Sequence, residues 1–280
     1  MAYWIRDATL QIKNRRYTLE KLDFSFDIPF EDSDELTTAI ITATNLAANT
    51  RNNIRRGDPV IVNAGYEGDI GCIFVGKIAG LSHKKGATDW TSKITATVAL
   101  DEWLHGKVNK TYKQGITAKA MMTDLLNIFG LEVGAFELAN NVVYQRGRVC
   151  RGKLKDVLRE IVVSDCKSRM MIRPTGQLII NKPDEGVTKG YLLTAKTGLL
   201  KSTDESEAIS IATALNTQTG PDEKEEHLKT RASLLNYRIG PADLIRIESH
   251  DLNGRFMVVR GRHFGSRSGD WKTEMELRPV

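Results

Sequence analysis

The sequence predicts an α+β fold that is mainly β, in which two β regions flank a small region that contains helices. Three patterns support this: alternating apolar and polar residues in the outer regions, helical spacing in the middle, and turn residues between short segments. At roughly 100–200 residues per domain, the 280 residues suggest about two domains, each able to bury a core. A composition with 41% apolar and 27% charged residues excludes collagen-like, coiled-coil and wholly disordered chains.

The first region, residues 1–105, has the patterns of β-strands. Apolar residues alternate with polar ones at positions 22–28, as in a half-buried strand, and we expect Pro29 and the acidic stretch after it to end that strand. Residues 36–45 are rich in Thr and Ile and predict another strand, whereas residues 46–54 predict a short helix or a turn. Further strands are expected at residues 59–64, 72–81 and 90–100. Short strands at this spacing suggest a barrel or a sandwich.

The middle region, residues 106–183, changes to helical spacing. Apolar residues recur along one face of residues 118–129, with Thr117 as a candidate N-cap and Gly130 as the stop. A second helix is predicted at residues 154–161. Residues 168–173 and 177–182 flank a Pro-Thr-Gly turn, which predicts a hairpin. The middle region is therefore expected to form a small α+β domain.

The third region, residues 184–280, returns to β patterns. Strands are predicted at residues 191–200, 244–249 and 255–261, the last two joined through an Asn-Gly turn. The final strand places Trp271 and every second residue after it on one face, with Lys272, Glu274 and Glu276 on the other. Residues 202–229 are polar and acidic, and we expect them to form a long exposed excursion.

Positive charge is concentrated in one part of the chain. The net charge is +5, yet residues 142–173 alone hold nine basic and three acidic residues. A solvated helix face or a protein interface explains such a cluster more often than nucleic acid does, and Tyr144 is the one aromatic residue in the basic stretch that could stack on a base. A β-barrel protein that binds nucleic acid through residues 146–173 stays the alternative function. The candidate partner-contact residues are Arg146, Arg148, Arg151, Lys153, Lys155 and Arg159.

The sequence also indicates the cellular compartment in which the protein folds. A charge follows the first residues at once, so we expect no secretory signal peptide, and no apolar stretch approaches the length of a membrane span. The three cysteines are far apart and odd in number, which predicts free thiols in a reducing cytosol. The five histidines and the cysteines lack metal-ligand spacing, so no metal site is expected.

No catalytic motif is present, and we expect that the protein is not an enzyme. The sequence lacks a nucleophile elbow, a P-loop, a dinucleotide fingerprint and a zinc-protease motif. Asp69, Asp101 and Glu102 are interpreted as surface charges at a barrel rim. The methionine pairs at 121–122 and 170–171 are interpreted as core residues because each lies in an apolar pattern. We therefore expect no catalytic residue and no cofactor.

Several segments in order resemble one protein family. In the first region they are the stretches at residues 41–46, 54–62, 64–66 and 71–78; in the middle region, residues 111–118, Gly152-Lys-Leu and residues 172–180; in the third region, residues 197–200, 233–237, 239–249, 254–259, 263–265 and 269–274. This set resembles a baseplate hub protein of contractile phage tails or phage-derived particles. Two departures are Pro241-Ala-Asp, where such hubs often have Pro-Gly, and the acidic insert at residues 202–229.

The resemblance implies an architecture and a role. It implies that residues 1–105 and 184–280 form two barrels similar to tail-tube subunits, flanking the α+β domain of residues 106–183. It implies a homotrimeric ring that joins the tail tube to the central spike and to other baseplate proteins, with no specific binding of nucleic acid. It also implies a place in the virion or tail particle, after assembly in the cytoplasm of a bacterial host.

Overall fold

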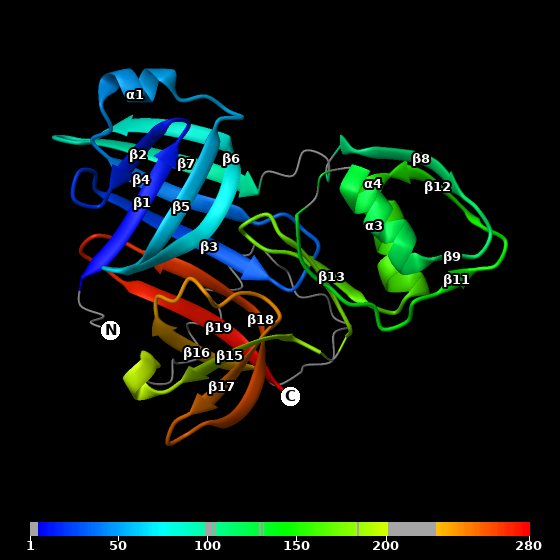
Figure 1. Cartoon of the computed structure of the whole chain (residues 1–280). Coiled ribbons are helices and arrows are strands. Elements are labelled where there is room, and N and C mark those ends of the chain that lie inside the picture. Colours follow the sequence, from blue (N-terminus) through cyan, green and yellow to red (C-terminus); the bar gives the residue numbers. More distant parts are fainter. Residues whose placement is uncertain are drawn as a thin grey trace.

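The computed structural model describes residues 5–98, 103, 105–128, 130, 132–183, 185–200 and 228–280. Figure 1 shows two β lobes, one above the other, with a helix-containing unit at their side. We call these parts the first β lobe, the second β lobe and the middle unit. The breaks between their strands lie between Val98 and Lys107 and between Asn181 and Val187.

The first β lobe contains seven strands and one short helix among the described residues. In chain order they are β1 (Arg6–Ile12), β2 (Arg15–Thr18), β3 (Phe24–Glu31), β4 (Thr38–Thr44), α1 (Ala48–Asn53), β5 (Pro59–Tyr66), β6 (Asp69–Lys85) and β7 (Trp90–Val98). Each expected strand of this region is present, and the helix-or-turn segment forms α1. The inward residues are apolar and buried, as the period-two pattern requires.

The middle unit wraps short strands around helices. Its elements are β8 (Lys107–Tyr112), β9 (Ile116–Thr117), α3 (Ala118–Ile128), β10 (Val133–Phe136), β11 (Val143–Tyr144), β12 (Arg148–Lys153), α4 (Leu154–Arg159), η1 (Glu160–Asp165), β13 (Arg169–Ile172) and β14 (Leu178–Asn181). The apolar stripe of α3 is buried, including Met121 and Met122, so their interpretation as core residues is confirmed. The second predicted helix is α4, which continues as the wider π-helical turn η1.

The second β lobe is formed by the C-terminal strands. Its elements are β15 (Val187–Leu193), η2 (Ala195–Thr197), β16 (Lys229–Leu234), β17 (Asp243–Glu248), β18 (Asn253–Gly265) and β19 (Trp271–Pro279). The strand expected at residues 191–200 begins earlier and ends at Leu193, because Thr194 caps the short turn η2. Of the excursion expected at residues 202–229, residues 202–227 lie outside the described residues, and Lys229 already belongs to β16.

One continuous sheet joins the two β lobes. The strand order β15-β17-β18-β3-β4-β7-β6-β5-β1-β2 runs through both lobes, and β16 and β19 extend it beside β18. The junction is the antiparallel pairing of β18 with β3, from Arg260 opposite Glu31 to Gly265 opposite Phe26. Among the described strands no pairing joins β2 back to β3, so closure of the first barrel stays a prediction.

Two expectations about strands are wrong in detail. Pro29 does not end its strand: β3 continues to Glu31, and Pro29 is tolerated because the pairing of β3 with β4 already stops at Asp27. The Asn-Gly turn is also misplaced: Asn253 and Gly254 already pair with Glu248 and Ile247, so residues 249–252 make the connection. The last strand has its expected two faces, and both are largely buried. Glu274 and Glu276 are 2% and 3% exposed, because each lies opposite an arginine of β18 in the sheet.

Candidate functional site

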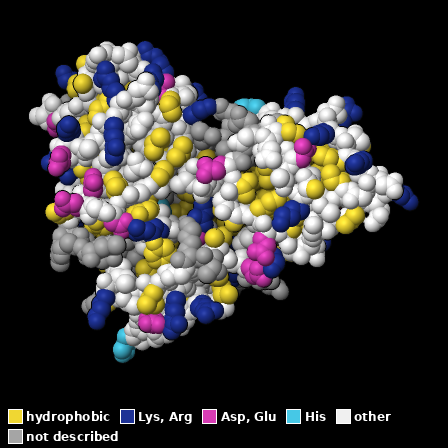
Figure 2. Space-filling view, in the orientation of Figure 1, with side chains coloured by type: hydrophobic (Ala, Val, Ile, Leu, Met, Phe, Trp, Pro, Cys, Tyr) yellow, Lys and Arg dark blue, Asp and Glu magenta, His cyan; other side chains and the backbone are white. Residues whose placement is uncertain are grey.

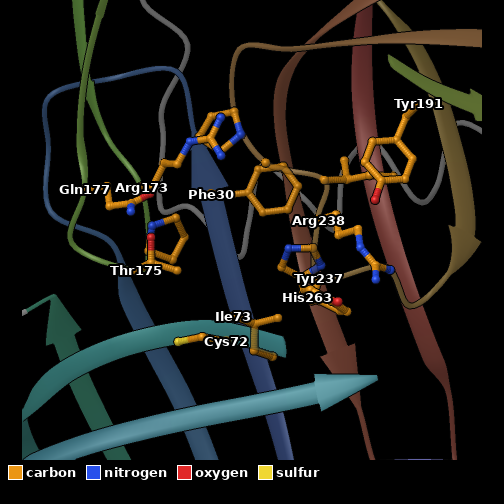
Figure 3. A pocket seen from close by; sticks show the side chains of 14 residues that line it. Phe30, Cys72, Ile73, Arg173, Thr175, Gln177, Tyr191, Tyr237, Arg238 and His263 are labelled. Atoms are coloured by element: carbon orange, nitrogen blue, oxygen red, sulfur yellow. The ribbon is translucent and has the colours of Figure 1, made fainter. Parts of the chain in front are cut away.

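The three parts of the chain meet around one cavity, which we call the seam pocket. Its volume is about 410 Å³. Figure 3 shows side chains converging on it from the first β lobe (Phe30, Cys72), the β13–β14 turn (Arg173, Gln177) and the second β lobe. Those of the second β lobe are Tyr191, Tyr237, Arg238, Ile239 and His263. The seam pocket therefore marks the place where the relative position of all three parts is set.

An acidic residue of the first β lobe anchors one side of the seam. Asp69, at the start of β6, accepts a hydrogen bond of 2.8 Å from the Tyr237 hydroxyl and two hydrogen bonds from the Arg238 guanidinium. The Arg238 hydrogen bonds hold the pKa of Asp69 below its ordinary value, and burial together with Asp69 raises the pKa of Tyr237 to about 12. Asp69 thus stays charged and Tyr237 stays a donor across the neutral range.

A glycine beside Asp69 leaves space for the Tyr237 ring. The Tyr237 ring lies against Gly71, where a Cβ atom would be 2.1 Å from ring carbons, so a larger residue would displace the ring. The Arg238 guanidinium lies 4.3 Å from the centre of the same ring. Asp69, interpreted from the sequence as a surface charge at a barrel rim, is 17% exposed and has a partner 168 positions away in the chain.

The β13–β14 turn inserts from the middle unit between the two β lobes. The Pro174 carbonyl accepts a 3.0 Å hydrogen bond from the Val75 amide of β6. On the other side, Arg173 donates a 2.5 Å hydrogen bond to Asp243, which is fully buried and also accepts the Gly240 amide at 2.8 Å. One turn therefore contacts both lobes, and its buried ion pair requires both partners to be present.

A buried histidine lines the seam pocket where the two β lobes meet. His263 of β18 is 3% exposed, its Nδ1 atom lies 2.9 Å from the Thr273 hydroxyl, and its ring centre is 4.9 Å from that of Phe30. Burial lowers the pKa of His263 to about 4, against a smaller opposing effect of the Ile239 carbonyl. The imidazole is therefore neutral at neutral pH.

Arginines and carboxylates alternate on the other face of the joined sheet. Arg260 donates to Glu276 and Arg262 to Glu274, each at 2.7 Å, and Arg262 also lies 3.4 Å from Asp27 of the first β lobe. The carboxylates of β19 are buried, so these pairs sit in a low-dielectric setting. Burial raises the pKa of Asp27, and Arg262 partly offsets this effect.

The polar side chains of the seam contact one another across the three parts of the chain. The seam carboxylates Asp69 and Asp243 are engaged by arginines, and the seam histidine is buried and neutral. Among the described residues, no three or more His, Cys, Asp or Glu side chains are grouped so that they could hold a metal ion. In the described part of the chain, no helix is long and apolar enough to cross a membrane.

The structure divides the six basic candidates into two groups. Arg148 pairs with Glu160 and Asp165 inside the middle unit. Lys155 and Arg159 of α4 bind the acidic loop of the first β lobe, Lys155 at 2.7 Å from Glu35 and Arg159 through two hydrogen bonds to Asp34. These three therefore form ion pairs within the chain. Arg146, Arg151 and Lys153 are exposed and make no ion pair with another described residue. Figure 2 shows Lys and Arg side chains along the outer border of this unit.

Sequence reasoning missed the residues of the seam. Tyr237, Arg238 and Asp243 lie in or beside the segments that carry the family resemblance, and Pro241-Ala-Asp243 is one of the noted departures. That departure was the available signal. Ala242 has a positive φ of 61°, and the tight turn it forms aims the Asp243 carboxylate back at the Gly240 amide.

Known structures share this fold, although no protein-family model and no curated protein sequence matches the chain. A tail protein from Neisseria meningitidis MC58 matches with a TM-score of 0.63 at 10% identity, over 98% of this chain and 97% of that one. A 43 kDa tail protein of prophage MuSo2 from Shewanella oneidensis matches with a TM-score of 0.63 at 8% identity, over 98% of both chains.

A third match is a component of the type VI secretion system of E. coli, which itself is structurally similar to the bacteriophage T4 tail proteins gp27 and gp5. Its TM-score is 0.59 at 13% identity, over 97% of this chain and 76% of that one. At such identities the similarity establishes the fold. The expected α+β, mainly β fold of phage tail proteins is confirmed over nearly the whole chain.

Proposed function

We propose that the chain is a structural baseplate protein of a phage-type tail, acting as a hub that joins the tail tube to the central spike and to surrounding baseplate proteins. The observation that carries the proposal is the extent of the fold: tail proteins match both β lobes and the middle unit together, over 98% of the chain. Fold alone does not fix a function, but the organisation of the seam suits this role.

The joined sheet suits a hub because it holds two β lobes in one fixed relation. Three such chains in a closed ring would present six β lobes, and the ring could then meet a threefold spike on one side and a sixfold tube on the other. Closed cyclic symmetry is the common arrangement of homo-oligomers. The role needs large interfaces and a central channel, and it involves no making or breaking of bonds.

The oligomeric state in solution tests the proposal. The chain mass is 31.2 kDa, so a homotrimer has a mass of about 94 kDa. Light scattering coupled to size-exclusion chromatography at micromolar concentration is expected to give the trimer mass, and electron micrographs of that fraction are expected to show rings with a threefold axis. A monomer at every concentration up to 100 μM, with or without added tube protein, would contradict the proposal.

A further inference from the structure

The outer face of the middle unit is a two-stranded antiparallel ribbon formed by β8 and β12. Figure 1 shows it along the border of that unit, with the helices on its inner side. Val108, Tyr112 and Cys150 point inward and are buried, and the Cys150 sulfur lies 3.6 Å from the sulfur of Met121 in α3. The alternate residues form the exposed face, which we call the ribbon face: Lys107, Asn109, Thr111, Val149, Arg151 and Lys153.

The charges of the ribbon face are all positive. Lys107 and Lys153 are directly opposite in the register, and Arg151 lies opposite Asn109. Like charges at opposite positions destabilise a strand pair, and folding alone would favour a carboxylate at one of them. The inner cations of the same strands have such partners, since Lys110 pairs with Asp124 and Arg148 with Asp165.

An apolar residue lies beside these cations. Val149 is 64% exposed, at the position before Arg151 on the same face, and its opposite residue is Thr111. The methyl groups of both residues gain nothing from contact with water, and a partner surface would cover them. The ribbon face thus offers three cations and a β-branched pair on one surface, and a partner with carboxylates and an apolar side chain would complement both.

We propose that the ribbon face binds an acidic protein surface, with carboxylates opposite Lys107, Arg151 and Lys153 and an apolar side chain over Val149. A protein is favoured over nucleic acid because no aromatic residue among the described residues of the face offers a stacking surface, and three cations are fewer than the six to ten phosphate contacts of a typical nucleic-acid site. The proposal goes beyond the hub role and does not depend on ring formation.

Fluorescence anisotropy at low salt tests the proposal with a labelled twelve-residue peptide of alternating Glu and Val. The triple variant Lys107→Glu, Arg151→Glu, Lys153→Glu is expected to bind it about tenfold more weakly than the natural chain. The matched control Arg16→Glu, Lys84→Glu, Lys85→Glu changes the same number of exposed charges on the first β lobe and is expected to bind like the natural chain. Equal losses in both variants, or no binding by the natural chain, would overturn the proposal.

A single substitution separates loss of binding from loss of folding. Lys107→Glu creates an opposite-charge pair with Lys153, so it is expected to raise the melting temperature by about 1–2 °C while it weakens peptide binding. A second arm uses duplex DNA with the same number of negative charges. Binding of the duplex that is tighter than peptide binding, and that the triple variant abolishes, would overturn the protein assignment in favour of nucleic acid.

Discussion

At the scale of single residues, burial determines what the charged and titratable groups of the seam can do. His263 is enclosed by the joined sheet and stays neutral, whereas Asp69 is held ionised by Arg238. Both groups serve the contact between the lobes, but they respond to acid over different pH ranges. The two ranges can therefore be measured separately.

The titration of His263 gives a prediction about stability and pH. The pKa of His263 is about 4 in the folded protein and about 6.5 in the unfolded chain. Between these two pH values the imidazole is protonated in the unfolded state and neutral in the folded state. The free energy of unfolding is therefore expected to fall by on the order of 3 kcal/mol as the pH drops from 6.5 to 4. Urea unfolding at several pH values measures this dependence.

Replacement of the imidazole checks the assignment. His263→Gln is expected to be less stable at pH 7.5, because the buried contacts with Phe30 and Thr273 change, and to lose most of the dependence on pH between 6.5 and 4. The variant His105→Gln, at an exposed position, is expected to keep it. The same pH dependence in His263→Gln as in the natural chain would rule out His263 as its source.

The roles of the basic residues in the middle unit are only partly predictable from the sequence. The basic excess of residues 142–173 is visible in the sequence, but the division of its members between internal ion pairs and the ribbon face is not. That division depends on where Asp34 and Glu35 of the first β lobe lie, more than 100 positions away. No local pattern carries such information.

At the scale of elements, β18 is the strand on which the architecture depends, and its glycines allow it to cross the core. At Gly261 a Cβ atom would lie 2.1 Å from the Glu274 carbonyl oxygen and 2.7 Å from the Phe30 ring. Neither neighbour can yield easily, because one is backbone and the other is packed in the core. The space above Gly261 is therefore needed for β18 to pair with β3 and β19 together.

A pair of glycine substitutions tests this requirement. Gly261→Ala is expected to lower the free energy of unfolding by about 2 kcal/mol, since it forces overpacking in the core. Gly80→Ala, in β6, places its Cβ at an ordinary 3.5 Å from Thr95 and is expected to change the stability by less than about 0.5 kcal/mol. Equal effects of the two substitutions in urea unfolding would show that the crossing tolerates a side chain.

Most elements were predictable from the sequence because local periodicity specifies them. The alternation at residues 22–28 corresponds to β3, and the apolar stripe at residues 118–129 corresponds to α3. The features that local periodicity does not specify depend on partners that are remote in the chain. Pro29 stays within a strand because its edge toward β4 is already free, and Glu274 and Glu276 are buried because β18 supplies arginines.

At the scale of the whole molecule, the joined sheet makes the two β lobes one mechanical body. The pairing of β18 with β3, the Asp69 anchor and the inserted β13–β14 turn all hold the same junction. The sequence indicated two similar β regions and a middle unit, but it contained no sign that one strand serves both lobes. Pairing across more than 200 residues is a property of topology that local periodicity does not encode.

Native-state hydrogen exchange tests whether the lobes open together. The slowest amides of β3, β5 and β18 are expected to exchange with the same free energy of opening and the same dependence on low concentrations of urea, because opening either lobe breaks the shared sheet. A lower free energy and a smaller urea dependence for β15–β19 than for β1–β7 would show that the second β lobe opens alone.

The shared sheet also has a consequence for synthesis of the chain on the ribosome. The edge of β3 that β18 covers emerges about 230 residues before its partner strand. At about 5–20 residues per second, translation of that distance takes roughly ten to forty-five seconds. During this interval an unpaired edge rich in phenylalanine is open to other nascent chains. Expression conditions that slow translation are therefore a hazard for this protein, and protection of the β3 edge by chaperones is most valuable before residue 265 has left the exit tunnel.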